Sequence, residues 1–164
     1  MKLPYKANVI FNSPLKAEEI IQRLMLNLEP KKTFRMFDYF KKNVPEYEGK
    51  IIGNDFTIQR ILINYRSSFN PIIYGNIIEE WNGSIIKIRM RVHKFVLWFS
   101  YIWFFVFIFF LIIDILISLL NLKEMLFYII LIVFIKTIFI YSFNYETKKS
   151  TKFLQDLFEA EIIQ

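Results

Sequence analysis

The pattern of apolar and polar positions divides the chain into three segments. Residues 1–94 alternate short apolar runs with charged residues, whereas residues 95–146 are almost continuously apolar. Residues 147–164 return to mixed polarity, with an amphipathic helical spacing in Phe153, Leu154, Leu157 and Phe158. The pattern predicts an α+β fold with a cytoplasmic antiparallel sheet domain over 1–94 and a transmembrane helical hairpin over 95–146. A C-terminal helix over 147–164 is expected to pack back on the sheet domain.

Both kinds of secondary structure are expected near the start of the chain. Residues 5–11 are typical of a strand, and Ser13-Pro14 is typical of a helix start, with Ser as N-cap and Pro at the first helical position. The helix that follows presents one apolar stripe, made of Ala17, Ile20, Ile21, Leu24 and Leu28. A second, basic and aromatic helix is expected over 32–43, lying either on the inner leaflet or on the sheet.

The clearest strand signal is a hairpin over 71–93. Asn82-Gly83 separates two alternating runs and favours a two-residue type I′ turn, which would place Trp81 opposite Ser84. One face of this hairpin is then apolar, and the other carries Tyr74 and a basic row made of Lys87, Arg89, Arg91 and His93. Another strand is expected over 56–65, where a change of apolar phase predicts a bulge near Arg60.

The two long apolar runs, 95–120 and 125–145, are each long enough to cross a bilayer as a helix, which takes about 20 residues. Several Lys and Arg precede the first run and follow the second, while the turn over 121–124 holds one Lys beside one Glu. The positive-inside rule then puts both chain ends in the cytoplasm and the turn outside, so we expect a location in a bacterial inner membrane.

Two ionisable residues, Asp114 and Lys136, interrupt the apolar runs. Such residues are costly in a bilayer and typically face protein or water. In antiparallel spans the two positions would differ in depth by about 8 Å. Three interpretations stay open: a structural ion pair that locks the hairpin, a polar lumen inside an oligomer, or snorkelling of the Lys136 side chain.

The amino-acid composition argues against several classes of functional site. Residues 1–94 hold 16 Lys and Arg against 9 Asp and Glu, so this segment is basic. The chain has no Cys and a single histidine, His93, which argues against a metal site, and its four glycines are too scattered to cradle a phosphate. We therefore expect no enzyme, no catalytic residue and no cofactor.

The basic row admits three partners. It would bind anionic lipid headgroups, dock an acidic protein, or bind an anionic nucleotide or oligonucleotide. In the last case the phosphates would lie on cationic side chains while an aromatic ring stacks on a base. The residues expected to bind such a ligand are Lys87, Arg89, Arg91, Arg60, Arg66 and Tyr74.

A basic cytosolic domain followed by a two-helix membrane hairpin resembles the two-transmembrane membrane effectors of bacterial anti-phage defence, of which the Hailong-type channel effector is one example. The resemblance implies a soluble part that senses a nucleotide or nucleic acid and a membrane part that self-assembles and breaches the inner membrane. We therefore expect a homo-oligomeric channel or pore gated by an anionic ligand. The alternatives are a non-conducting anchor or scaffold for a protein partner and a lipid-responsive accessory subunit of a transporter.

Overall fold

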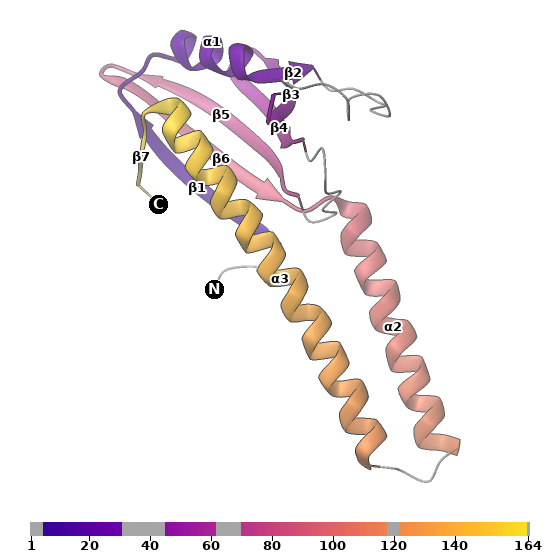
Figure 1. The fold of residues 1–164 in the computed structure, drawn as a ribbon. Helices are drawn as coiled ribbons and strands as arrows, with labels where there is room; N and C mark the ends of the chain where they lie inside the picture. Colours follow the sequence, from indigo (N-terminus) through magenta and orange to yellow (C-terminus); the bar gives the residue numbers. More distant parts are fainter. Residues whose placement is uncertain (1–4, 31–44, 62–69, 118–121, 164) are drawn as a thin grey trace.

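The computed structural model describes residues 5–30, 45–61, 70–117 and 122–163. Within them the chain is α+β, as predicted: a mostly antiparallel seven-stranded sheet and three helices (Figure 1). The strands, in the spatial order β2-β3-β4-β5-β6-β1-β7, are β1 (Lys6–Ser13), β2 (Leu28–Pro30), β3 (Tyr47–Ile52), β4 (Asp55–Arg60), β5 (Ile72–Glu80), β6 (Gly83–Arg91) and β7 (Glu161–Ile162). The helices are α1 (Ala17–Asn27), α2 (Lys94–Ile117) and α3 (Leu122–Phe158).

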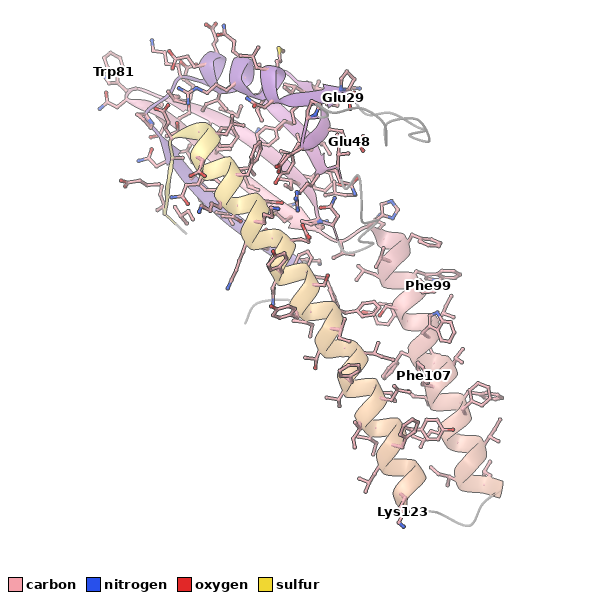
Figure 2. The ribbon with its side chains drawn as sticks, viewed as in Figure 1. Glu29, Glu48, Trp81, Phe99, Phe107 and Lys123 are labelled. Atoms are coloured by element: carbon pink, nitrogen blue, oxygen red, sulfur yellow. The ribbon has the colours of Figure 1, made fainter. Side chains whose placement is uncertain are left out.

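Helices α2 and α3 run side by side away from the sheet, and both are long and apolar enough to cross a membrane (Figure 1). None of the residues in the most apolar window of α2 is buried. Large side chains of α2 are exposed, such as Phe99, which is 47% exposed (Figure 2). A soluble protein rarely exposes so large an apolar surface, and a core helix would be buried. The chain therefore has two candidate membrane-spanning helices.

Helix α3 is continuous over 37 residues and passes from the apolar hairpin into the sheet domain. The helix expected over 147–164 is therefore the last part of a longer helix, because no Gly or Pro interrupts residues 122–158. The last turns of α3 pack back on the sheet, as expected, and bury Leu154 and Phe158. The chain then forms β7, in which Ile162 pairs with Phe11 of β1 instead of extending the helix.

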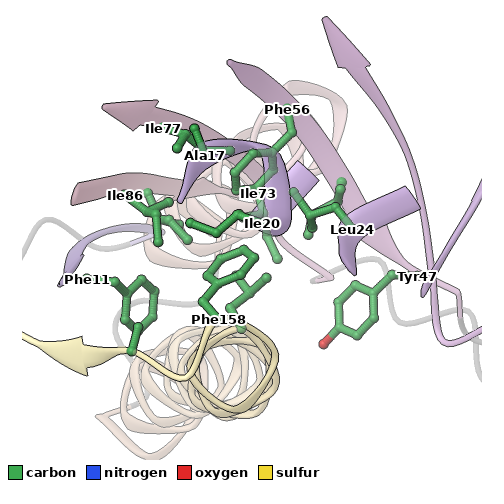
Figure 3. Close-up of a cluster of buried hydrophobic side chains, with 14 of the residues drawn as sticks. Phe11, Ala17, Ile20, Leu24, Tyr47, Phe56, Ile73, Ile77, Ile86 and Phe158 are labelled. Carbon is green, nitrogen blue, oxygen red and sulfur yellow. The ribbon is translucent and has the colours of Figure 1, made fainter. Parts of the chain in front are cut away.

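The hydrophobic core lies between one face of the sheet and two helices, α1 and the end of α3 (Figure 3). Ile20 and Leu24 of α1 contribute to it, and the Phe158 ring meets the rings of Phe11 and Phe56 edge to face. The sheet contributes the inward positions of its strands, among them Ile58, Ile73, Ile77, Ile86 and Met90. The end of a candidate membrane helix is therefore part of the core of the sheet domain.

The β5–β6 hairpin has a register two residues away from the predicted one. The two-residue loop is Trp81-Asn82, and Gly83 pairs with Glu80 as the first residue of β6. Gly83 has φ +139°, and a Cβ there would collide with the backbone carbonyl of Ser13. Gly83 is thus needed for close approach to β1. Because the shift is two residues, each side chain stays on its predicted face.

The first helix also begins later than predicted. Ser13 ends β1, and α1 starts at Ala17 with no side-chain cap. The Ser13 hydroxyl is buried, donates to the Phe158 carbonyl over 2.6 Å and accepts from the Leu15 amide. It therefore anchors the end of α3 instead of capping α1. The second helix expected over 32–43 lies outside the described residues.

Candidate anion-binding face

One face of the sheet carries cationic side chains because the other face is packed by helices. In β6 the buried positions alternate with exposed ones, and the exposed ones include Lys87, Arg89 and Arg91. In β1, Lys6 occupies an equivalent exposed position. We call this surface, with Lys6, Lys87, Arg89, Arg91 and Tyr74, the cationic face. Three members of the predicted basic row, Lys87, Arg89 and Arg91, lie on β6, whereas His93 lies beyond the end of that strand. Lys6 on β1 and Tyr74 on β5 extend the surface to either side of β6.

The strand register fixes the neighbours of each cation on the cationic face. Each β6 cation has one residue beside it on β1 and one on β5. Arg89 lies between Asn8 and Tyr74, Lys87 between Ile10 and Asn76, and Arg91 between Lys6 and Ile72. The Tyr74 ring, 44% exposed, therefore stands next to the central guanidinium of the row.

This arrangement places like charges close together. Lys6 and Arg91 are direct cross-strand partners, which destabilises a sheet, and the three β6 cations follow one another at every second residue. Among the residues that the structure describes, no carboxylate forms an ion pair with Lys87, Arg89 or Arg91. A bound anion would relieve this repulsion.

The cationic face is also hollowed. A shallow depression of about 590 Å³ is lined by the three β6 cations, Asn8, Tyr74, Asn76 and Asp55. At its edge, Asn76 Nδ2 donates to Asp55 Oδ1 over 2.7 Å. Small-molecule sites commonly measure about 300–1,000 Å³. The depression thus has room for a nucleotide and combines cations, one aromatic ring and an amide–carboxylate pair.

Not all of the predicted ligand-binding residues share this surface. Lys87, Arg89, Arg91 and Tyr74 do, whereas Arg60 lies on the opposite, helix-covered face of the sheet, in line with Phe56 and Ile58. Arg66 lies outside the described residues. Lys6, Asn8 and Asp55 were missed. Lys6 and Asn8 could have been identified from the alternation of polar and apolar residues along β1, which places both on the same face of the sheet.

Arg60 instead forms an ion pair at the point where α3 leaves the sheet domain. Its Nη1 lies 3.0 Å from Oε2 of Glu146 on α3, and the two side chains are only 13% and 11% exposed. Glu46 lies 3.7 Å from Arg60 Nε, and Asn70 donates to the Arg60 carbonyl. The change of apolar phase near Arg60 therefore reflects a buried charge, and β4 ends there.

Tyr47 reinforces the same region. It is fully buried, its ring stacks on Phe153 at 4.1 Å between centroids, and its hydroxyl lies 3.4 Å from the Ser150 hydroxyl. Burial raises the pKa of the Tyr47 hydroxyl above its usual 10.0. We call Tyr47, Arg60, Glu146 and Ser150 the junction, because they join β3 and β4 to α3 just beyond the apolar hairpin.

Within the apolar hairpin, the Lys136 ammonium lies 4.7 Å from the centroid of the Phe104 ring on α2. The side chain of Asp114 lies outside those that the structure describes, so an ion pair between Asp114 and Lys136 stays a prediction. At the start of α2, the His93 Nδ1 accepts a hydrogen bond from the Phe95 amide, which is a capping role.

No cluster of three or more His, Asp or Glu that could hold a metal occurs in the described part of the chain. Searches of family models, curated proteins and solved structures found no match to this chain.

Proposed function

We propose that this protein is a homo-oligomeric channel of a bacterial inner membrane, gated by an anionic nucleotide or oligonucleotide that binds the cationic face. The observation that carries the proposal is the continuity of α3. This helix packs against the inner face of the sheet that bears the cationic face, and it continues without a break into the apolar hairpin. Ligand binding on the sheet thus has a rigid route to the membrane.

The ligand class follows from the side chains on the cationic face. Arg89 and Arg91 provide planar donor groups that suit phosphate oxygens, and Tyr74 stands beside Arg89 where a base would stack. Asp55 and Asn76 at the edge offer hydrogen-bond partners for the polar edge of a base. A phosphate-bearing, aromatic ligand matches all of these groups together, which a simple inorganic anion does not.

Binding of lipid headgroups explains only part of the cationic face. Lys87 lies about 13 Å farther along β6 than Arg91, at about 3.3 Å per residue. In Figure 1, the C-terminal end of β6 leads into the start of α2, so the N-terminal part of this strand lies farther from the apolar helices. The headgroup layer is only about 5–8 Å thick on each side. Arg91 and its neighbour Lys6 would therefore lie closer to headgroups than Lys87.

Self-association follows from the membrane part. One helical hairpin encloses no pore, so conduction requires several copies. Both ends of the described chain belong to the sheet, because β1 pairs with β7, and this supports the proposal that they share one side of the membrane. The positive flanks of the hairpin make that side the cytoplasm. The copies would then present their cationic faces to one compartment.

Binding is tested with the full chain in neutral detergent and a fluorescent single-stranded oligonucleotide of about ten nucleotides. We expect Arg89→Glu with Arg91→Glu to weaken binding by at least about tenfold and to lower its salt dependence. Lys148→Glu with Lys149→Glu is the matched control, since it makes the same charge change at exposed positions of α3 and should leave affinity unchanged. If both variants lose the same amount of affinity for the oligonucleotide, the binding is non-specific charge attraction and the proposed site is wrong.

Conduction is tested by measuring the mass of the purified protein in detergent and its current in planar bilayers. We expect a closed ring, and a current that changes when the oligonucleotide is added on the side of the sheet domain. A monomer that carries no current would refute the channel. Experiments in vesicles with and without anionic lipid distinguish the two ligands. If the cationic face binds anionic lipid but not the oligonucleotide, its ligand is the lipid headgroup.

One observation favours the alternative of a non-conducting anchor. Trp81 is 98% exposed at the tip of the β5–β6 hairpin, far from the end of the apolar helices marked by Lys123 (Figure 2). Tryptophan is a common anchor in protein interfaces. A monomer without current, still held in the membrane, would therefore point to a protein partner at this tip.

A further inference from the structure

Lys136 lies near the middle of the bilayer if α3 spans it. Twelve residues separate it from Glu124 on one side and from Lys148 on the other, which is about 18 Å of helix in each direction. The hydrocarbon core is about 30 Å thick, so its midplane is about 15 Å from either boundary. A lysine side chain reaches only about 6 Å. Snorkelling therefore does not bring this ammonium to an interface.

The described residues do not satisfy Lys136 within one copy. The side chain is exposed, and its contact is the Phe104 ring at 4.7 Å. An aromatic face attracts a cation but accepts no conventional hydrogen bond, whereas an ammonium has three donors. In the described part of the chain no carboxylate pairs with Lys136. The hydroxyl of the neighbouring Thr137 donates to the Val133 carbonyl over 2.8 Å, and no hydrogen bond joins it to Lys136 in the described part of the chain.

We propose that Lys136 faces a water-filled lumen enclosed by several copies of this chain, and that this lumen selects for small inorganic anions such as chloride. The inference rests on the proposed channel function and names the ion that it passes. Water in the lumen would accept the hydrogen bonds that the described residues leave unmade. A ring of ammonium groups at the midplane would give the pore a positive potential, which favours anions and excludes cations.

The neighbours of Lys136 on α3 suit a gated pore. Val133 and Ile140, three residues before it and four after it, share its helix face and are 58% and 41% exposed. The lumen would therefore have one wettable ring between two apolar ones. A narrow apolar constriction empties of water and closes without a moving plug, so a small rotation of α3 suffices to open or close it.

The absence of cysteine allows a direct test of the lumen in the full chain. Lys136→Cys is compared with Phe134→Cys, which lies at nearly the same depth but about 200° around the helix. In vesicles treated with an anionic, membrane-impermeant thiol reagent, we expect the Lys136→Cys side chain to be modified and the Phe134→Cys side chain to be protected. Protection of both positions, with and without the oligonucleotide, would overturn the inference.

Ion selectivity is the second measurement. Under a potassium chloride gradient, the reversal potential should show anion preference in the native chain and in Lys136→Arg. This preference should be lost in Lys136→Gln and reversed in Lys136→Glu. Lys149→Gln is the control, because it removes a cation outside the span and should leave selectivity unchanged. Currents whose selectivity ignores position 136 would overturn the lumen while leaving the channel standing, whereas a monomer without current would overturn both.

Discussion

The junction provides a quantitative prediction, because two of the Arg–Glu pairs in the sheet domain differ strongly in burial. Arg60 and Glu146 lie 3.0 Å apart with side chains 13% and 11% exposed, whereas Arg23 and Glu159 lie closer, at 2.7 Å, but are 35% and 57% exposed. Distance alone would make the second pair the stronger one. Burial makes Arg60–Glu146 the more important pair for stability. Removing one of its partners leaves the other charge without access to water, whereas the remaining charge of the Arg23–Glu159 pair stays hydrated.

The magnitudes follow from this contrast. Breaking a buried pair typically costs about 3–5 kcal/mol, whereas an exposed pair contributes about 0.2–1 kcal/mol. Glu46, 3.7 Å from Arg60 Nε and itself largely exposed, offers partial compensation. We therefore expect Glu146→Ala to destabilise the sheet domain by about 3 kcal/mol, at the low end of that range, and Glu159→Ala by less than about 1 kcal/mol.

Native-state hydrogen exchange of the full chain in detergent measures this difference where it arises. A loss of about 3 kcal/mol accelerates exchange of the slowest β4 and β5 amides by about a hundredfold. Replacing both partners, with Arg60→Met and Glu146→Leu, should restore most of the stability, because no unpaired charge remains. Equal effects of Glu146→Ala and Glu159→Ala, or an undiminished loss from Glu146→Ala in the Arg60→Met background, would refute this reasoning.

Three further predictions test the packing, the junction and the coupling. A Cβ at Gly75 would overlap the Phe56 ring, so Gly75→Ala should cost about 1–3 kcal/mol by hydrogen exchange, and Phe56→Leu should recover part of that loss. The raised pKa of Tyr47 means that the folded state holds this proton more tightly than the unfolded state; its contribution to stability is complete below pH 10.0 and is lost as the pH rises through the folded value. Tyr47→Phe should therefore lose less stability above pH 10.0 in alkaline unfolding titrations. Asn144→Pro removes a helical hydrogen bond where α3 leaves the span, at about 3 kcal/mol; oligonucleotide affinity should persist while its effect on the bilayer current disappears.

The sequence predicted the features that depend on periodicity alone. The apolar runs identify α2 and α3 because crossing a bilayer takes about 20 residues. The period of two assigned Lys87, Arg89, Arg91 and Tyr74 to one face, and this assignment survived an error in register because the shift was an even number of residues.

The features that were not predicted depend on contacts distant in sequence. Gly83 was assigned to a turn, but the structure uses it for its approach to Ser13, 70 residues earlier. Ser13 was assigned to a helix cap, but its hydroxyl binds the Phe158 carbonyl at the other end of the chain. Local propensity favours a turn or a cap in each case, and tertiary packing overrides it.

Arg60 and Lys136 show how charges at apolar positions distinguish structural roles from functional ones. Each interrupts an apolar pattern, and each therefore needs a partner that the pattern does not provide. For Arg60 the chain supplies that partner itself, Glu146, and the result is a junction between sheet and helix. For Lys136 the described chain supplies only an aromatic ring. An ammonium at the midplane of a bilayer is not stable on such a contact alone. In the proposed channel, water enclosed by neighbouring copies would accept its hydrogen bonds, and Lys136 would then determine which ion passes.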